Sequence, residues 1–456
     1  MPSIPRMVTL TNSSVDVLNA IRNSATQNYQ NLVPIATPDA DSIRKIGAII
    51  MNYPQLQNEF LSALVNRIGR VVLTSKMYDN PWKEFKKGRL EYGETIEEIF
   101  VNIAKPFQYD PEVAQDTLYK REKPDVRSTF HIMNYQKYYK VTVDEPRLNQ
   151  AFLAWNGIVE LIGYIVDSLY TGANYDEFLV MKYMIARHIL NGELKAVEID
   201  AVTSANMKSI VSKVKGVSND LTFLSNKNNL AHVYNASKKE NQNMIVDTKF
   251  DATMDVEVLA SAFNMSKAEF MGKRTLVNAF GDVDNDRLAV LFENDPTYVP
   301  LTAAEIEALN AIPAVLVDDN WLQIYDNYEN FTEAFNGEGI YWNYWYHVWK
   351  TFSVSPFAPA VVFVAGTPSV TSVTVTPATA TVGAGQSLQL NATVEVANFA
   401  SKSVKWEITA GGDYARITQG GALYIDADAT SAASITVKAT SLFDSTVYDT
   451  ATITVA

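Results

Sequence analysis

The side chains of this chain that could do chemistry are few and widely spaced. Its four histidines form no HExxH or other short-spaced pair of metal ligands: they are His131, His188, His232 and His347. The chain has no cysteine, which excludes thiol catalysis, iron–sulfur clusters, cysteine-ligated zinc and disulfides. No Walker A, GxGxxG or GxSxG pattern occurs in it. The sequence therefore predicts no catalytic residue, no cofactor or cofactor-binding residue, and no metal ligand.

The best candidate for a metal site is the stretch DVDNDRLAVLFE over residues 282–293. Four acidic residues fall at positions 1, 3, 5 and 12 of an EF-hand loop: Asp282, Asp284, Asp286 and Glu293. Position 6 of such a loop needs glycine for its sharp turn, and here it is Arg287. We expect an acidic turn followed by a strand over residues 287–292, and not a calcium site.

The basic cluster KEFKKGR over residues 83–89 could contact phosphate. The whole chain, however, carries a formal net charge of −13, whereas proteins that bind the phosphate backbone of nucleic acids are usually basic. We therefore expect the cluster to form a subunit contact or a solvated face. The acidic balance still suits a surface that lies near DNA without binding it tightly.

The run YWNYWYHVWKTF over residues 341–352 holds seven Trp, Tyr or Phe residues in twelve. In a strand, one face would carry Trp342, Tyr344, Tyr346, Val348 and Phe352, and the other Tyr341, Trp345, His347 and Trp349. Nucleic-acid stacking platforms pair aromatic with basic residues, and only Lys350 is basic here. A sugar site would need more polar partners. We expect a strand covered on both faces, in a core or a subunit interface.

The segment before this run predicts a projecting hairpin and two helices. Residues 71–143 alternate as strands, with TIEEIFVNI (95–103) and RSTFHIMNYQKYYKVTV (127–143) flanking a polar tip. Such a hairpin cannot bury itself, so we expect it to lie on a neighbour. An apolar stripe with steps of three and four predicts a helix over residues 146–170, ended by Gly172, and a second helix over 175–190.

Shorter signals mark other elements. Ser14 could cap a helix over residues 15–23, and residues 255–264 are also expected to be helical. Thr302 and Glu305 have capping-box spacing before a helix over 303–310. Residues 314–317 read as a strand.

Composition changes near Gly366–Pro368, where Thr, Ser, Ala and Val become abundant. Glycine-rich turns separate five short alternating segments that predict a β-sandwich: 372–377, 387–396, 402–408, 434–440 and 449–455. The 456 residues are 47% apolar and 20% charged, which indicates two or three globular domains. We expect no signal peptide and no membrane span, because the most apolar helical stretch, 151–170, is interrupted by polar residues. The absence of cysteine fits a reducing cytoplasm.

Seven ordered segments resemble the major capsid proteins of phi-29-like short-tailed phages. They are VLNAIRNS (17–24), LVNRIG (64–69), FKKG (85–88), TIEEIF (95–100), DVEVLASAFNM (255–265), AVLVDDNWLQIYDN (314–327) and GIYWNYWYHVWKTFSVSPFAPAVVFVAG (339–366). The C-terminal region resembles a bacterial Ig-like group 2 domain, through VTVTP, Gly385, the LxLxAxV pattern of Leu388–Val394, Trp406 and the Gly421–Leu423 turn.

The resemblance implies an α+β chain with the HK-97-type capsid fold, followed by an all-β Ig-like sandwich. It implies this order: an N-terminal arm with helices (1–70), an E-loop hairpin (71–145), a peripheral domain with a long spine helix (146–195), an axial domain (196–330), return strands (331–366) and the Ig-like domain (367–456). The acidic stretch 282–312 has no counterpart in the resemblance.

The function implied is that of a structural, non-enzymatic capsid subunit, assembled in the bacterial cytoplasm. Its partners would be further copies in pentamers and hexamers, a scaffolding protein, a portal, and enclosed double-stranded DNA that is not read by sequence, with no membrane contact. Two alternatives stay open: a surface adhesin, and a glycan-active enzyme with paired carboxylates and an Ig-like accessory domain.

Overall fold

The computed structural model describes residues 14–53, 55–57, 59–60, 63, 79–91, 95–107, 121–144, 151–152, 157–256 and 273–456. The chain divides into two interleaved units. Unit 1 comprises Met1–Glu94, Met133–Phe178 and Tyr325–Thr351, and unit 2 comprises Thr95–Ile132, Leu179–Ile324 and Phe352–Ala456. The boundary between the two units crosses three elements: helix α7 (Gly157–Leu190), strand β9 (Leu322–Asn336) and strand β10 (Tyr341–Val354).

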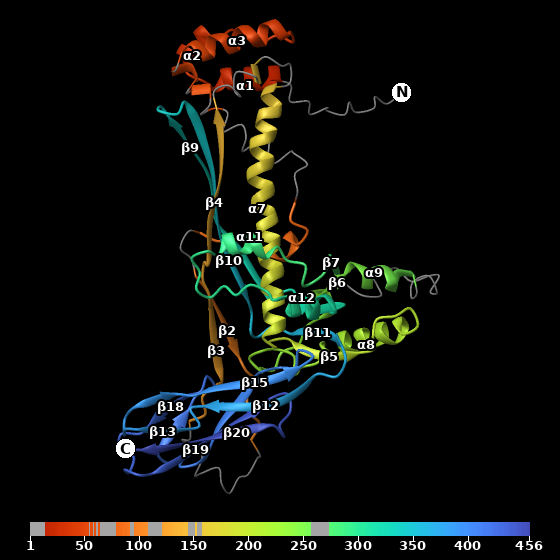
Figure 1. Cartoon of the computed structure of the whole chain (residues 1–456), viewed down its shortest axis with the longest axis vertical. Coiled ribbons are helices and arrows are strands. Elements are labelled where there is room, and N and C mark those ends of the chain that lie inside the picture. Colours follow the sequence, from red (N-terminus) through yellow and green to blue (C-terminus); the bar gives the residue numbers. More distant parts are fainter. Residues whose placement is uncertain are drawn as a thin grey trace. The chain divides into compact units, whose positions relative to one another are not determined.

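Unit 1 combines helices with one mixed-length sheet (Figure 1). The helices before the sheet are α1 (Ser14–Ser24), α2 (Gln27–Leu32), α3 (Ala40–Asn52) and the 3₁₀ turn η1 (Lys83–Phe85). The sheet has the order β1-β9-β10-β4, formed by β1 (Lys86–Arg89), β9 (Leu322–Asn336), β10 (Tyr341–Val354) and β4 (Tyr135–Asp144). Strands β10 and β4 are antiparallel, from Tyr341 opposite Asp144 to Lys350 opposite Tyr135. The predicted aromatic strand and helix at 15–23 are confirmed.

The core of unit 1 lies where the aromatic strand meets the helices. Trp342, Tyr344, Tyr346 and Val348 are buried together with Ile21, Ile43 and Ile46 of the N-terminal helices and with Ile165 and Leu169 of α7. The rings of Tyr170, Phe331 and Tyr346 stack, with centroids of Tyr170 and Tyr346 4.4 Å apart. One face of β10 is thus buried within its own chain.

Helix α7 (Gly157–Leu190) is continuous over 34 residues, so the prediction of two helices divided at Gly172 is wrong. Gly172 keeps a helical backbone. An interior glycine costs only about 1 kcal/mol relative to alanine, which the buried side chains on both sides of it offset. Gly192, in contrast, takes a φ of +70° just after the helix and ends it. The predicted start at Pro146 lies outside the described residues.

Unit 2 contains a five-stranded sheet of order β5-β11-β8-β6-β7. Its strands are β5 (Lys195–Ile199), β11 (Ala360–Ala365), β8 (Ala314–Asp318), β6 (Gln242–Asp247) and β7 (Lys273–Val277). The pairs β5–β11 and β6–β7 are parallel, and β8 is antiparallel to both of its neighbours. Helices α8 (Met207–Asp220) and α9 (Thr248–Met254) cover it, burying Met207, Ile210, Val211, Phe250 and Met254 against Leu316 and Phe363. A 3₁₀ turn, η2 (Lys239–Asn241), precedes β6.

Two further helices of unit 2 test sequence predictions. Helix α12 (Ala303–Asn310) begins with the predicted capping box of Thr302 and Glu305, and β8 confirms the strand at 314–317. The strand predicted over 287–292 is wrong, because α11 (Asn285–Leu291) occupies it. Asp284 caps this helix by accepting a hydrogen bond from the Arg287 backbone N–H at 3.0 Å. Of the helix predicted over 255–264, residues beyond 256 lie outside the described residues.

The C-terminal region of unit 2 is all-β, as predicted. Its strands are β12 (Ser369–Thr376), β13 (Thr379–Val382), β14 (Ser387–Gln389), β15 (Asn391–Ala397), β16 (Val404–Ala410), β17 (Ala415–Ile417), β18 (Ala422–Ile425), β19 (Ser434–Ser441) and β20 (Tyr448–Val455). They form sheets β12-β15, β13-β20-β19-β16 and β14-β18-β17 around Leu390, Trp406, Leu423, Ile435 and Ile453. Gly421 has a φ of +81°, and a Cβ there would lie 2.3 Å from the Leu390 carbonyl oxygen.

Candidate functional site

No catalytic or metal constellation is found in the part of the chain that the structure describes. There, no group of three or more His, Asp or Glu side chains is placed to hold a metal ion. The four histidines lie apart and contact different partners: His131 contacts Glu98 and Ser353, His188 contacts Glu193, His232 contacts the Asn226 carbonyl, and His347 contacts Thr332. The EF-hand-like acidic residues are part of the turn and helix α11. No helix of the described residues is long and apolar enough to cross a membrane.

The hairpin of β2 (Ile96–Val101) and β3 (Val126–His131) presents the most distinctive surface (Figure 1). The two strands are antiparallel, with Glu97 opposite Phe130 and Val101 opposite Val126, so these side chains share one face. The apolar residues of this face and its continuation are all strongly exposed: Ile99 (59%), Val101 (58%), Ile103 (52%), Val126 (51%), Phe130 (60%) and Ile132 (59%). We call this set the hairpin face. It confirms the predicted alternation of residues 95–103.

The opposite face of the hairpin is anchored within unit 2. Glu98 accepts a hydrogen bond from the Ser355 hydroxyl at 2.8 Å and contacts the imidazole Nε2 of His131 at 3.1 Å. The Phe100 ring stacks on Phe357 with centroids 5.5 Å apart. The hairpin is therefore held on one side by its own chain, while the hairpin face has no comparable cover among the described residues.

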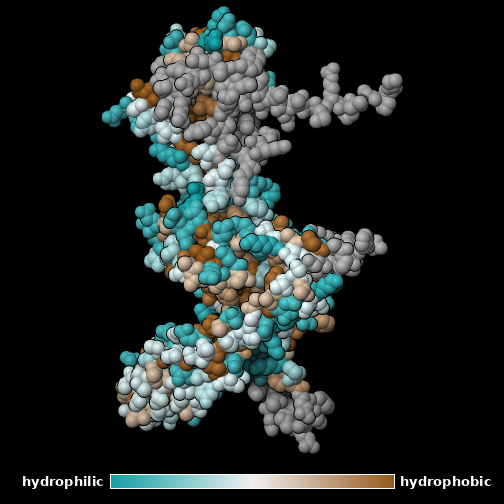
Figure 2. Space-filling model, turned by 45° about the vertical axis from the view of Figure 1, so that its right-hand side comes forward, coloured by the Kyte–Doolittle hydropathy of each residue, from teal (hydrophilic) through white to brown (hydrophobic). Residues whose placement is uncertain are grey.

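Elsewhere the apolar surface is dispersed. Figure 2 shows brown apolar side chains interspersed with teal polar ones over the visible face. Scattered exposed apolar residues are normal for a folded protein, whereas four on one face of a two-stranded sheet, with two more in its continuation, are not.

The outer face of the aromatic strand is only partly covered. Tyr341, Trp345, His347 and Trp349 are half-buried, and the neighbouring Tyr138 is 62% exposed. Lys350, considered in the sequence as the basic partner of a stacking surface, is buried. Lys350 is therefore not part of this face, where Lys140 Nζ instead lies 5.6 Å from the Trp345 ring centroid. The expectation that this second face is covered in a subunit interface stays a prediction.

Lys350 belongs to a cluster of four charged residues inside unit 1, which we call the charge cluster: Lys86, Glu177, Asp326 and Lys350. The Lys350 ammonium contacts the Glu177 carboxylate and lies 2.8 Å from Asp326 Oδ1. Lys86 Nζ lies 2.6 Å from Asp326 Oδ2 and 3.2 Å from Glu177 Oε2. The side chains of Glu177 and Lys350 are 2% and 5% exposed.

Electrostatics keep the charge cluster ionised despite its burial. Burial favours the neutral form of Lys350, but Glu177 and Asp326 outweigh it and raise the pKa of Lys350 above its ordinary value. Burial likewise acts to raise the pKa of Asp326, and the two lysines reverse this and lower it. The expectation that the basic segment 83–89 is a subunit contact or a solvated face is wrong for Lys86, because that side chain is 21% exposed and paired within its chain.

Together these features define a class of protein. A five-stranded sheet, a long helix packed on a second sheet, and the hairpin of β2 and β3 are the parts of the HK-97-type capsid fold. The solved capsid structure of Staphylococcus phage Andhra matches with a TM-score of 0.50 at 13% identity, over 64% of this chain and 86% of that chain.

The family is shown by sequence. The Phi29-like phage major capsid protein family model matches residues 18–364, and the bacterial Ig-like domain (group 2) model matches residues 369–454. The major capsid protein of Bacillus phage PZA is 35% identical over 432 residues, covering 94% of this chain and 90% of that relative. That of Bacillus phage B103 is 35% identical over 433 residues, with the same coverage.

The chain therefore belongs to the phi29-like phage major capsid protein family. It is a capsid subunit of a tailed phage and assembles into the shell of the virion, and neither the adhesin nor the glycan-enzyme alternative is favoured. The sequence analysis did not single out Val126 and Phe130 of β3 or Ile132 just after it, which the alternation in VRSTFHI (126–132) could have indicated.

Proposed function

We propose that the chain forms pentamers and hexamers by laying its hairpin face on a neighbouring copy, and that these close into an icosahedral head. The observation that carries the proposal is the hairpin face itself, six apolar side chains at 51–60% exposure on a strand pair already anchored from behind. An apolar surface of this kind in a shell subunit has one chemically matched partner present at high copy number, which is the next subunit.

The binding free energy of one hairpin contact is expected to be small, whereas the sum over all contacts in a closed shell is large. Fully burying one such side chain contributes about 1.5–3 kcal/mol. Burying the exposed half of each of these six side chains would therefore contribute roughly 1 kcal/mol per side chain, before the entropic cost of association is subtracted. Each subunit in a closed lattice both donates a hairpin and receives one, and the repeated contacts reinforce one another.

The other segments take the roles suggested by the family. Residues 1–70 act as an arm, 71–145 as the E-loop region, 146–195 and 331–366 as the peripheral domain, 196–330 as the axial domain, and 367–456 as an Ig-like domain on the outer surface. The net charge of −13 supports a lining that encloses double-stranded DNA without reading its sequence. Assembly takes place in the host cytoplasm with a scaffolding protein and a portal, and the role is structural and not catalytic.

Electron microscopy with two variants at one position tests the hairpin face. Phe130→Asp places a charge in the contact, whereas Phe130→Leu keeps an apolar side chain of similar reach. Expressed with the scaffolding protein, the native chain and Phe130→Leu should give closed shells in negative stain. Phe130→Asp should give folded, unassembled subunits by circular dichroism and sedimentation. Shells of normal yield from Phe130→Asp would refute the proposed contact.

A further inference from the structure

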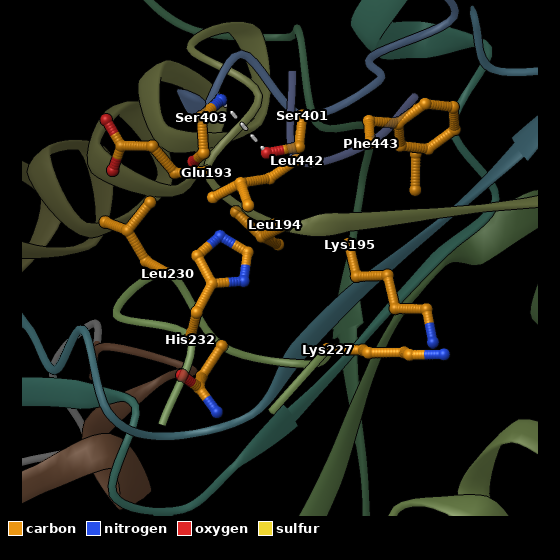
Figure 3. Close-up of a pocket in the computed structure, with 12 residues that line it drawn as sticks. Glu193, Leu194, Lys195, Lys227, Leu230, His232, Ser401, Ser403, Leu442 and Phe443 are labelled. Atoms are coloured by element: carbon orange, nitrogen blue, oxygen red, sulfur yellow. Dashed lines mark hydrogen bonds between the residues drawn. The ribbon is translucent and has the colours of Figure 1, made fainter. Parts of the chain in front are cut away.

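The proposed hairpin contact requires a receiving surface on the neighbouring copy. Each strand of the hairpin has six residues, so the hairpin face extends over about 20 Å and needs an apolar surface of that length. The cavity of about 330 Å³ in unit 2 is too small to receive it, and Figure 3 shows Glu193, Lys195 and Lys227 among the side chains that line this cavity. A second sheet face is the better match, because sheets pack on one another face to face.

The outer face of strands β4 and β10 in unit 1 has the required length and character. Six of its side chains, which we call the aromatic face, form three cross-strand pairs: Trp345 with Lys140, His347 with Tyr138, and Trp349 with Gln136. Tyr138 is 62% exposed, Lys140 and Gln136 are exposed, and the three side chains of β10 are half-buried. On the described strands of the Ig-like region, by comparison, the exposed aromatic residues Tyr424 and Tyr448 belong to different sheets.

The hairpin face and the aromatic face carry matching patterns of charge. On the hairpin, Glu97 is exposed on the same face as the apolar residues and lies opposite Phe130, near one end of the pairing. On the aromatic face, Lys140 lies opposite Trp345, also at one end, with its Nζ 5.6 Å from the ring centroid. In both faces the following side chains are spaced by two residues, or about 7 Å. The acidic and basic ends can therefore coincide while apolar side chains lie on aromatic rings.

We propose that the hairpin face of one copy packs on the aromatic face of the next copy, with Glu97 paired to Lys140. This inference rests on the hairpin contact proposed above and adds its receiving surface and its register. The giving and receiving surfaces are different parts of the chain, so the contact runs head to tail and closes into rings. It covers the second face of the aromatic strand, whose first face is buried in the core of unit 1. The opposite charges fix the direction of the hairpin on the partner.

Thiol cross-linking in assembled shells tests the register. The chain has no cysteine, so only introduced thiols react. A short bis-maleimide is used because a paired Glu and Lys hold their backbones farther apart than a disulfide allows. Shells from an equal mixture of Glu97→Cys and Lys140→Cys chains should give covalently linked pairs on a denaturing gel. Either variant alone should give none, and neither should Glu97→Cys mixed with Lys213→Cys, which alters an exposed lysine of α8.

Exchange of the two charges tests the pairing itself. Glu97→Lys or Lys140→Glu alone should raise the subunit concentration needed for shells by about fivefold. The double variant Glu97→Lys/Lys140→Glu should return it to within about twofold of the native value, because the pair is restored with its signs exchanged. Circular dichroism verifies folding of each unassembled variant.

The outcomes separate this inference from the proposed function. If Phe130→Asp assembles normally, the hairpin contact itself is wrong. If Phe130→Asp prevents assembly but shells of the Glu97→Cys and Lys140→Cys mixture give no linked pairs, the hairpin contact stands and the aromatic face is not its receiving surface. A charge-exchanged double variant that assembles no better than the single variants would likewise overturn the pairing of Glu97 with Lys140.

Discussion

Replacing Lys350 with methionine should destabilise unit 1 far more than removing an exposed lysine does. The substitution keeps the length and apolar stem of the side chain but removes its ammonium. Glu177, at 2% exposure, and Asp326, at 18%, would then share Lys86 as the remaining cation of the cluster, while the Asn80 amide still donates to Glu177 Oε1. Two buried carboxylates with one cation leave one negative charge uncompensated, which is the costly outcome for a buried ion pair.

The expected loss is about 3–5 kcal/mol of unfolding free energy, the usual cost of removing one partner from a buried pair. For a folding unit of 150–250 residues, each 1 kcal/mol lowers the melting temperature by about 2–4 °C, so the expected drop is about 6–20 °C. The double variant Lys350→Met/Asp326→Asn restores charge balance, since Lys86 and Glu177 remain as a pair. It should recover most of the loss.

Thermal and urea unfolding followed by tryptophan fluorescence measures this, because Trp82, Trp342, Trp345 and Trp349 all belong to unit 1. The matched control is Lys83→Met, which removes a lysine that pairs with Asp79 at the surface; both side chains are more than 60% exposed. That control should cost less than about 1 kcal/mol. If Lys350→Met costs no more than Lys83→Met, or if the double variant is worse than the single one, the charge cluster is not what stabilises this unit.

Three more predictions concern unit 2. Burial lowers the pKa of Lys182 to about 8, against about 10.4 in an unfolded chain. Between these values the native state binds fewer protons than the unfolded state, so the free energy of unfolding should rise from pH 8 to about 10.5. Urea midpoints across this range should show the rise in the native chain and not in Lys182→Met. Thr302→Ala removes the side-chain half of the capping box, in which the Thr302 hydroxyl accepts from the Glu305 backbone N–H, and should cost about 1 kcal/mol in urea unfolding, whereas Thr302→Ser should cost little. Gly192→Ala should lower the free energy of unfolding by more than about 1 kcal/mol, because φ is +70° and the new Cβ would lie 2.6 Å from the Ala400 carbonyl oxygen. Faster proteolysis of the Ig-like region would report this loss. An unchanged rate of proteolysis would contradict the prediction.

The elements that the sequence predicts well are those set by local pattern. The alternation of residues 95–103, the capping box at Thr302 and most sandwich strands after Gly366 depend on neighbouring residues, and the structure confirms them. The strand predicted over 387–396 is instead two strands, β14 and β15, in different sheets. The short strands β13, β17 and β18 were missed because three or four residues carry too little alternation to be recognised.

The errors occur where tertiary contacts override a local signal. Gly172 has the right spacing for a helix end, but the buried residues on both sides of it keep α7 continuous. Residues 287–292 are rich in apolar side chains that suit either a strand or a helix. Asp284, as an N-cap, and Leu288 and Leu291, as a buried pair three residues apart, make them helical.

The charge cluster could not be predicted from sequence. Lys86, Glu177 and Asp326 are separated by more than ninety residues and follow no common motif. Sites assembled from single residues of distant segments require the three-dimensional structure.

Polar and apolar groups have different places in this capsid subunit. The polar contacts described above lie within the chain. The charge cluster fixes the sheet of unit 1, and Glu98, through His131 and Ser355, fixes the inner face of the hairpin. Such contacts are directional and specify one geometry. The hairpin face, in contrast, presents non-directional apolar surface. If the subunit forms the five-fold and six-fold rings that we propose, such a surface would tolerate the small changes of angle between them, while the polar contacts behind β2 and β3 would keep the hairpin itself in one geometry.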